Sequence, residues 1–184
     1  LFLDWYIPRI IKKKKQKIIK KKLKNIIKIL LKKIKNQNHV FVHRDFHVSN
    51  LMEYKKKIAI IDNQDALYGN HAYDLASLID DVRLKTSNSL KEKIFKYYLK
   101  KNKSINTKNF KNDFDLLSVL RNIKIIGIFT RLSTRDKKHH YLKLIPYAWK
   151  LIEYRINNNL LFNDLKLFLG KNFSIKMRKK KWKK

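Results

Sequence analysis

Apolar residues and lysines recur at helical spacing near the start of the chain. Between positions 11 and 36, Ile or Leu returns every three or four residues, and lysine fills most of the other positions. The apolar positions of this face are Ile19, Leu23, Ile26, Ile27, Leu30 and Ile34. The spacing predicts one amphipathic helix, because residues three and four apart share a face. Packing on its own domain is the favoured reading, and a membrane-surface or partner-binding helix is the alternative.

The next third of the chain changes to strand-like patterns and then returns to helical spacing. Residues 39–43 alternate and include β-branched and aromatic side chains, which predicts a short strand. A second short strand is predicted at 57–61, after a turn at 53–56. The segment YDLASLIDDVRL at 73–84 has apolar residues at helical spacing and predicts a mostly buried helix.

The rest of the sequence has only helical patterns. Polar stretches separate helices predicted at 89–102, 112–130, 138–158 and 160–169. Pro146 is expected to bend or begin one of them. The predicted fold class is therefore α+β and mostly α-helical, with one domain over residues 1–175 and a frayed basic tail at 176–184.

Composition narrows the class of protein. A chain of 184 residues, 44% of them apolar, can form one domain with a hydrophobic core. There is no apolar run long enough for a membrane span and no signal-peptide pattern. The absence of cysteine excludes disulfides and thiolate metal sites, so a cytoplasmic protein is expected. The chain begins with Leu1 inside an apolar segment, which is typical of the interior of a longer protein.

The formal charge of +32 is a further feature, and it has two interpretations. Lysine accounts for 38 of the 46 basic residues, and Ile and Asn are also abundant, as an AT-rich genome would encode. A solvated lysine surface of compositional origin is the favoured interpretation. The alternative is a face that binds a polyanion such as nucleic acid. In either case the charge favours anionic substrates such as nucleotides.

The most specific motif is HRDFHVSN at 43–50, which matches the kinase catalytic-loop pattern H-R-D-x-x-x-x-N residue for residue. In that pattern the aspartate, here Asp45, accepts the proton of the substrate hydroxyl, and the asparagine, here Asn50, holds magnesium. Asp62 follows twelve positions later, at the end of an apolar run where a second metal-binding carboxylate would lie. The three residues in this order predict phosphoryl transfer that uses ATP and Mg²⁺.

Longer segments around this motif resemble a known family. HRDFHVSNLM at 43–52, IIDNQDALYG at 60–69 and AYDLASLIDDVR at 72–83 resemble the aminoglycoside phosphotransferase and choline kinase group. Within that group they are most similar to the bacterial N-acetylmuramate/N-acetylglucosamine anomeric kinases. DWYIPR at 4–9 resembles the junction between the two kinase lobes, and residues 121–153 resemble the C-terminal helices of the same subfamily.

The resemblance implies the C-terminal lobe of a protein-kinase-like fold, with a small β-hairpin carrying the catalytic loop. It also implies an N-terminal nucleotide-binding lobe that this chain lacks, because its three glycines are too far apart to form a phosphate-covering loop. The implied function is ATP-dependent phosphorylation of a sugar, at the anomeric hydroxyl of N-acetylmuramate or N-acetylglucosamine in cell-wall recycling. An aminoglycoside or other small-alcohol kinase remains an alternative, as does a non-catalytic basic remnant that binds nucleic acid.

Further residues receive supporting roles. His43 and Arg44 are expected to shape the loop, and Asp74 to accept hydrogen bonds from its backbone. Asn63 stands where related kinases carry an aromatic residue, so an amide is expected near the core.

Several other residues could contact the substrate. His47 could contact it or pack within the loop, and Arg121 and Asn122 could face it or occupy solvated helix positions. The substrate-side candidates are His47, Gln64, Asp65, Arg121 and Asn122.

Overall fold

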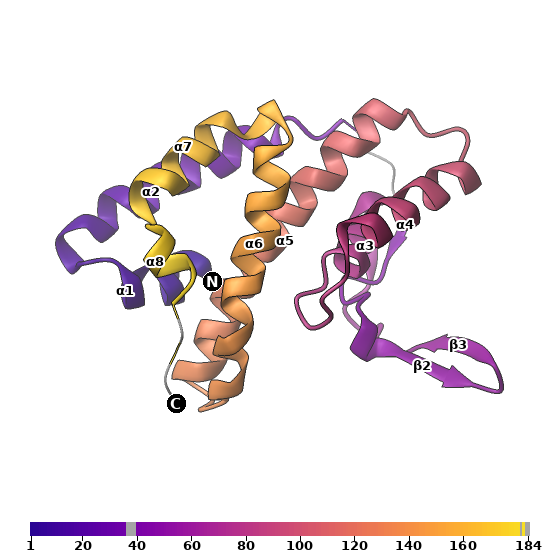
Figure 1. The fold of residues 1–184 in the computed structure, drawn as a ribbon, viewed down its shortest axis with the longest axis horizontal. Coiled ribbons are helices and arrows are strands. Elements are labelled where there is room, and N and C mark those ends of the chain that lie inside the picture. Colours follow the sequence, from indigo (N-terminus) through magenta and orange to yellow (C-terminus); the bar gives the residue numbers. More distant parts are fainter. Residues whose placement is uncertain (36–39, 181, 183–184) are drawn as a thin grey trace. The chain divides into compact units, whose positions relative to one another are not determined.

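The computed structural model describes residues 1–35, 40–180 and 182, and Figure 1 shows their secondary structure. Helices predominate, and four short strands form two separate sheets. The predicted α+β, mostly α-helical class is confirmed. The elements in chain order are η1 (Phe2–Tyr6), α1 (Ile7–Ile10), α2 (Lys13–Leu31), β1 (Val40–Val42), η2 (Val48–Asn50), β2 (Leu51–Tyr54), β3 (Lys57–Ile60), β4 (Leu67–Gly69), α3 (Ala72–Ile79), α4 (Asn88–Lys101), α5 (Thr107–Thr134), η3 (His139–Leu144), α6 (Ile145–Asn157), η4 (Leu160–Phe162), α7 (Asn163–Asn172) and α8 (Ile175–Arg178).

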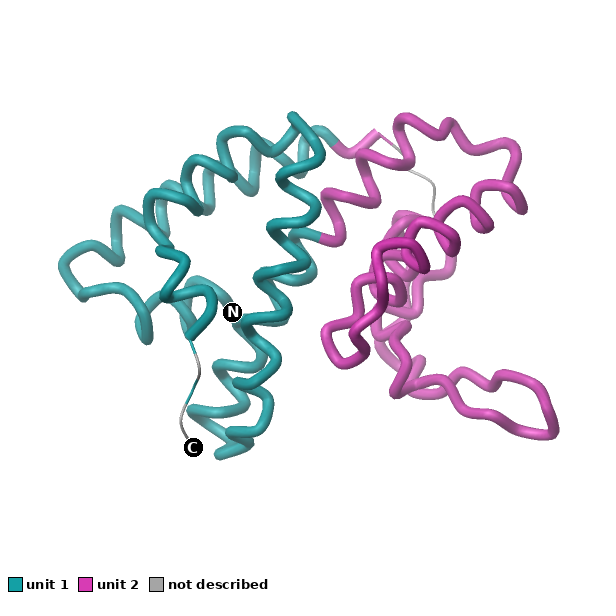
Figure 2. Tube along the Cα trace, viewed as in Figure 1, with its two compact units in different colours: residues 1–33, 119–184 teal, residues 34–118 magenta. Residues whose placement is uncertain are grey.

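The chain divides into two compact units, coloured separately in Figure 2. Unit 1 comprises residues 1–33 and 119–184, and unit 2 comprises residues 34–118. The long helix α5 contributes its first part to unit 2 and its remainder to unit 1. No helix of the described residues combines the length and apolar character needed to cross a membrane.

An aromatic cluster forms the centre of unit 1. Phe2, Tyr6, Trp149 and Phe173 lie with ring centroids 4.9–6.2 Å apart, in tilted, stacked and edge-on pairs. The Nε1 of Trp149 donates a hydrogen bond of 3.0 Å to the hydroxyl of Tyr6. Burial raises the pKa of Tyr6 to about 12. A Cβ at Gly127 would lie only 2.3 Å from the backbone nitrogen of Phe2, so this close approach requires glycine.

The amphipathic helix α2 packs one face within unit 1. Ile19, Leu23 and Leu30 are buried, and the lysines between them are mostly exposed. The helix is shorter than the predicted range 11–36. It begins at Lys13 and ends at Leu31, because Lys32 and Lys33 form a turn, and position 36 lies outside the described residues.

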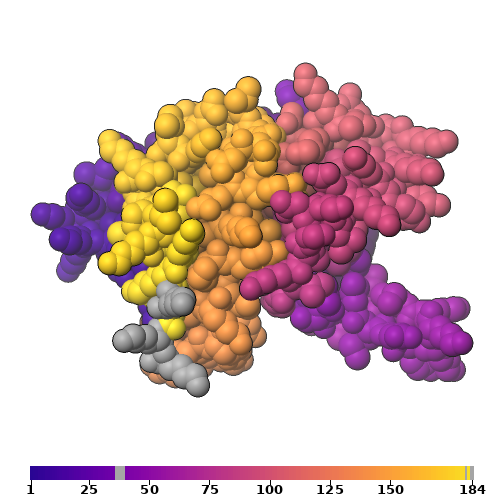
Figure 3. Space-filling model, viewed as in Figure 1, coloured from indigo at the N-terminus to yellow at the C-terminus, as the bar shows by residue number. Residues whose placement is uncertain are grey.

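Two antiparallel strand pairs organise unit 2. Strands β2 and β3 form a hairpin, with Leu51 opposite Ile60. Strands β1 and β4 pair with Val40 opposite Gly69, although β4 was not predicted. In Figures 1 and 3 the hairpin extends outward from α3 and α4 of the same unit. The strand predicted at 39–43 corresponds to β1, while His39 lies outside the described residues.

The hairpin turn is tighter than the sequence suggested. The predicted turn at 53–56 is wrong in its first half, because Glu53 and Tyr54 belong to β2. Only Lys55 and Lys56 form the turn, with φ angles of 48° and 59°. Two-residue hairpin turns with both φ angles positive match the twist of the strands, which explains why the turn is so short.

The helices of unit 2 pack around an apolar core. Helix α3 contacts α4, and its buried face meets the beginning of α5. Helix α5 begins at Thr107, five residues before the predicted 112, because the side chain of Asn106 accepts a hydrogen bond from the backbone of Asn109 and caps the helix. The core residues are Ala72, Leu75, Ala76, Ile79, Phe110 and Phe114.

Other helix predictions also need correction. The helix predicted at 73–84 ends at Ile79, and the one predicted at 160–169 is a 3₁₀ turn followed by α7, which continues to Asn172. The helix predicted at 138–158 is a 3₁₀ segment followed by α6, which begins at Ile145 with Pro146 in its first turn, where a missing N–H is tolerated. The frayed tail is wrong for residues 176–178, which belong to α8. Arg178 anchors this helix by donating hydrogen bonds of 2.8 Å to the Glu153 carboxylate and to the Phe173 carbonyl.

Candidate active site

The two segments singled out by the motif lie side by side in unit 2. Residues 43–50 connect β1 to β2, and residues 61–66 connect β3 to β4. Because β1 pairs with β4 and β2 pairs with β3, both connections run between the same two sheets. The Ile61 amide donates to the Asn50 carbonyl at 3.1 Å, and the His43 Nε2 lies 3.0 Å from the Ile61 carbonyl oxygen. The topology thus brings together residues from both segments.

The side chains of Asn50 and Asp62 meet where these segments join, beside the backbone of Asp45. The Asn50 side-chain nitrogen donates to the Asp45 carbonyl at 2.9 Å and lies 3.5 Å from Asp62 Oδ2. The side chain of Asn50 is therefore oriented by the loop itself, which leaves its Oδ1 as a ligand oxygen. Asp45 is partly exposed, and its carboxylate accepts no hydrogen bond from the described residues. Its oxygens remain available for a substrate hydroxyl.

The loop at 43–50 is held by one carboxylate at its start. Asp74, in the first turn of α3, accepts hydrogen bonds from the backbone amides of His43 at 2.7 Å and Arg44 at 3.0 Å. Arg44 has a φ of 71° and its guanidinium donates to the Asp65 carbonyl at 3.1 Å. A non-glycine residue rarely adopts positive φ, and these contacts hold Arg44 in that conformation.

Asp62 has a similarly unusual backbone, with a φ of 72°. Its side chain is exposed, and its Oδ1 accepts a hydrogen bond of 2.8 Å from Gln64. Oxygen ligands of this kind suit Mg²⁺, which keeps several waters and binds substrate phosphates rather than a closed protein cage. Asn50 and Asp62 fit that pattern, and no cluster of three or more Asp, Glu or His side chains suited to a metal occurs within residues 1–35, 40–180 and 182.

A cavity of about 310 Å³ opens beside the loop. His43, Asp74 and Asn63 contribute to its wall, together with apolar side chains from β1 and β3. The expectation that Asn63 lies near the core is wrong, because its side chain is exposed at the cavity and its carbonyl accepts the Ala66 amide. A polar residue can therefore occupy this position without burial of an amide.

The substrate-side candidates do not form one group. His47 is buried, with 8% of its surface exposed, and its backbone closes the turn between Asp45 and Asn50. Gln64 and Asp65 are exposed and follow Asp62.

Arg121 and Asn122 belong to unit 1, and at 6% and 0% exposure they are not solvated helix positions. The periodicity alone did not reveal this burial, because α5 is enclosed on more than one side.

A second carboxylate, not predicted from the sequence, supports the loop. Asp81 is buried and accepts a hydrogen bond of 3.2 Å from the backbone amide of Val48, near the opposite end from Asp74. Asp80, its neighbour, is paired with Lys91 at 2.9 Å and accepts a hydrogen bond from Ser118. The sequence does contain a signal for this support, the two carboxylates of Asp80 and Asp81 directly after an apolar helix. Carboxylates at such a position become buried, and buried carboxylates need hydrogen-bond or charge partners.

A third buried carboxylate, Asp113, fixes the segments that flank the sheet of β1 and β4. It accepts hydrogen bonds of 3.0 Å from the Lys35 amide and from the Asn70 side chain. Asn70 in turn accepts the Ala72 amide at the start of α3. Burial lowers the pKa of the neighbouring His71, and the Asp113 carboxylate opposes that shift.

The amino-acid sequence was compared with those of known proteins. Residues 2–107 match the model of the phosphotransferase enzyme family. The chain is similar to curated proteins named N-acetylmuramate/N-acetylglucosamine kinase. It is 33% identical to that of Caulobacter vibrioides over 119 residues, which is 62% of this chain and 33% of the relative. For Pseudomonas aeruginosa the identity is 31% over 159 residues, or 83% of this chain and 47% of the relative.

A third relative, from Neisseria meningitidis serogroup B, carries the same name and is 36% identical over 116 residues. That match covers 60% of this chain and 35% of the relative. The chain thus spans a third to about half of the length of these curated relatives. The sequence resemblance is confirmed by these matches.

Proposed function

Because the chain belongs to the phosphotransferase enzyme family, we propose that it supplies the catalytic loop and the metal ligands of an ATP-dependent sugar kinase. The observation that carries the proposal is the convergence of Asp45, Asn50 and Asp62 on a loop held by Asp74. The motif spacing supports the three roles, and the hydrogen bonds place Asn50 beside Asp62 and the Asp45 backbone.

Asp45 is the proposed proton acceptor. Its carboxylate orients the attacking sugar hydroxyl and removes the proton as the bond to phosphorus forms. Phosphoryl transfer depends mostly on positioning, so a loop fixed at both ends is well suited to it. Asp74 and Asp81 would act as positioning residues, since they contact the loop backbone at its two ends. His43 and Arg44 would shape the same turn.

Asn50 and Asp62 would hold magnesium through Oδ1 and the carboxylate respectively. Bound Mg²⁺ would neutralise charge on the nucleotide phosphates. The phosphates would also need a covering loop and a lysine. We propose that residues 1–175 form the C-terminal lobe of a protein-kinase-like fold and that a separate N-terminal lobe, outside the present sequence, supplies both. The three glycines of this chain are too widely spaced to form such a loop.

The proposed acceptor is the anomeric hydroxyl of N-acetylmuramate or N-acetylglucosamine, within cell-wall recycling. The names of the relatives support the sugar class. An anomeric hydroxyl is more acidic than an ordinary alcohol, so a carboxylate base is adequate. His47, Gln64 and Asp65 are the nearby candidates for substrate contact, with Arg121 and Asn122 as further candidates.

The test is a phosphorylation assay on the longest protein that contains this chain in its reading frame. Purified protein would be incubated with Mg-ATP and each amino sugar, with kanamycin as the competing alcohol acceptor. We expect sugar-dependent ADP release, and Asp45→Asn should lower kcat by at least about 10²-fold, the usual scale for loss of a general base. Glu92→Gln removes the same charge from an exposed position on α4 and should leave the rate unchanged.

Three results would count against the proposal. Equal turnover in Asp45→Asn would remove Asp45 from the mechanism. Preference for kanamycin would replace the sugar acceptor with an aminoglycoside. Loss of activity in Glu92→Gln would show that the rate depends on net charge or on folding and not specifically on the Asp45 carboxylate.

A further inference from the structure

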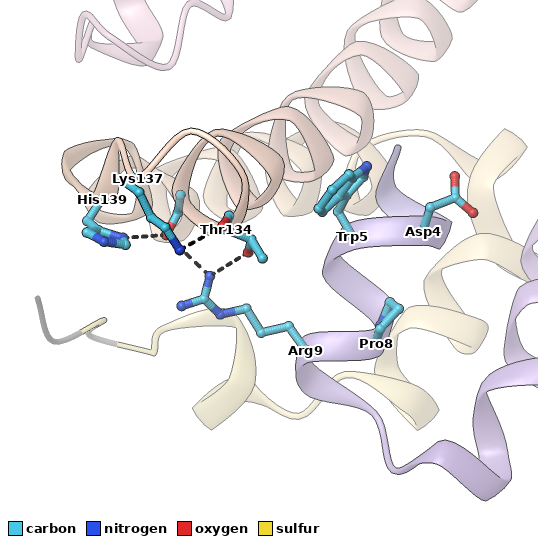
Figure 4. A pocket seen from close by; sticks show the side chains of 8 residues that line it. Asp4, Trp5, Pro8, Arg9, Thr134, Lys137 and His139 are labelled. Atoms are coloured by element: carbon cyan, nitrogen blue, oxygen red, sulfur yellow. Dashed lines mark hydrogen bonds between the residues drawn. The ribbon is translucent and has the colours of Figure 1, made fainter.

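A cavity of about 530 Å³ in unit 1 brings several cationic and hydroxyl groups together. Figure 4 shows Trp5 and Arg9 on one side, and Thr134, Lys137 and His139 around the end of α5 on the other. Every residue of its wall belongs to unit 1, whereas the proposed catalytic loop belongs to unit 2. The cavity is therefore a separate feature of the chain.

Arg9 is the central cation of this cavity. Its Nη1 donates to the hydroxyls of Ser133 and Thr134, both at 3.3 Å, which is long for hydrogen bonds from a guanidinium. The guanidinium also lies 4.7 Å from the ring centroid of Trp182. It forms no ion pair with a carboxylate of the described residues, so no negative charge lies in direct contact with it. A guanidinium has five N–H donors, most of which stay available.

Lys137 and His139 add donors to the same space. The Lys137 Nζ lies 3.5 Å from the Thr134 carbonyl, at the limit of a hydrogen bond. The His139 Nδ1 lies 2.9 Å from the Ser133 hydroxyl, which leaves Nε2 without a partner among the described residues. In Figure 4 the Lys137 side chain extends toward Arg9, and the His139 ring faces the end of α5.

Nearby carboxylates do not neutralise this group. The Asp136 carboxylate is bound to Arg135 at 2.6 and 3.2 Å. The Asp4 carboxylate is part of the cavity wall but lies beyond Trp5 from Arg9 in Figure 4. The cationic side chains of Arg9, Lys137 and His139 therefore contribute to one cavity without a paired carboxylate, and Trp5 contributes an apolar part of its wall.

We propose that this cavity binds a phosphate group. Guanidinium, ammonium and hydroxyl donors that lie together without pairing to a carboxylate match a phosphate, which accepts several charge-assisted hydrogen bonds at once. The Asp4 carboxylate in the wall is paired with the N-terminal ammonium of Leu1 at 3.2 Å. Cations at a helix C-terminus can also stabilise its exposed carbonyls, and the Lys137 contact to Thr134 has that geometry. Arg9, however, contacts side-chain hydroxyls rather than carbonyls, so helix stabilisation does not account for its position.

The test is calorimetric titration of this chain with inorganic phosphate at a fixed ionic strength of about 0.15 M, where diffuse charge effects are screened. We expect saturable binding at one site per chain. Arg9→Gln and Lys137→Gln should each weaken binding at least about tenfold, which corresponds to about 1.4 kcal/mol. Lys150→Gln removes one charge from an exposed position on α6 and should change the affinity less than about twofold.

Additional ligands identify the chemistry and its source. Acetate should bind at least about tenfold more weakly than phosphate, because it has fewer acceptor oxygens and less charge. Tighter binding of phenyl phosphate than of phosphate would identify an organic phosphate whose body contacts Trp5. Equal binding of the two would identify free phosphate as the ligand.

The proposal is overturned by any of three outcomes. These are the absence of saturable binding, acetate binding as tight as phosphate binding, or an equal loss of affinity in Lys150→Gln and Lys137→Gln. Arg9→Gln also removes the contact to Trp182, so circular dichroism must show that it folds. If it does not fold, Lys137→Gln decides the question, since its side chain is exposed and its one contact is weak.

Discussion

Lys91 provides the sharpest test of how unit 2 is stabilised. It lies on α4 with 3% of its surface exposed, and its ammonium contacts the Asp80 carboxylate at 2.9 Å and the Ile79 carbonyl at the end of α3. Asp80 is fully buried and also accepts the hydroxyl of Ser118 from α5. One ion pair therefore connects three helices around the core.

Replacing Lys91 by Met keeps most of the side-chain volume and removes the charge. Asp80 would then be a buried carboxylate without its cation, a change that typically costs about 3–5 kcal/mol. At an m-value of about 2 kcal/mol/M, the urea midpoint of unit 2 should fall by about 1.5–2.5 M. Asp81 follows Asp80 directly and holds the Val48 amide, so the catalytic loop should loosen as well.

The two units can be followed separately in this experiment. All three tryptophans, Trp5, Trp149 and Trp182, belong to unit 1, so their fluorescence reports that unit. Hydrogen exchange of the amides in α3 and α4 reports unit 2. Lys93→Met is the matched control, because it removes an exposed lysine from the same helix and should change the midpoint by less than about 0.3 M.

A double variant, Lys91→Met with Asp80→Asn, removes both charges. It should recover at least half of the stability lost in Lys91→Met alone, because no unpaired charge remains buried. The reasoning is refuted if Lys91→Met and Lys93→Met have equal midpoints. It is also refuted if the effects of Lys91→Met and Asp80→Asn on the free energy of unfolding simply add in the double variant.

Three further predictions concern the loop, the hairpin and the aromatic cluster. Asp74→Ala removes the acceptor of two backbone amides in the catalytic loop, so their hydrogen exchange should accelerate at least about tenfold, and unchanged exchange would exclude this carboxylate as their anchor. Replacing Lys55-Lys56 by Asn-Gly should stabilise the hairpin by about 0.5–1 kcal/mol, because both positions have positive φ; a lower urea midpoint would contradict that turn geometry. The raised pKa of Tyr6, about 12, means that its stabilising contribution is complete below the unfolded value of about 10 and is lost as pH rises through about 12. Between pH 10 and 12 the free energy of unfolding of Tyr6→Phe should therefore fall by about 2 kcal/mol less than that of the parent chain. Identical pH profiles of the two proteins would show that groups other than Tyr6 cause the loss.

The sequence by itself determined the local features of this protein. The spacing of Asp45, Asn50 and Asp62 is a short-range pattern, and the structure brings the side chains of Asn50 and Asp62 within 3.5 Å of each other. The apolar periodicity of α2 and α3 likewise depends on neighbours three and four residues away, so both helices were predicted. The ends of helices and strands were predicted less well, because side-chain caps such as Asn106 before α5 and turns such as Lys55-Lys56 after β2 compete with periodicity.

Only the tertiary structure decided which polar residues lose contact with water. Lys91 and its exposed neighbour Lys93 are indistinguishable in a lysine-rich sequence, yet Lys91 meets a carboxylate at the end of another helix, α3. Arg9 and Thr134 meet across 125 positions, and no local pattern encodes such a pair. Burial and charge pairing depend on which distant segments pack together, whereas secondary structure depends mainly on adjacent residues.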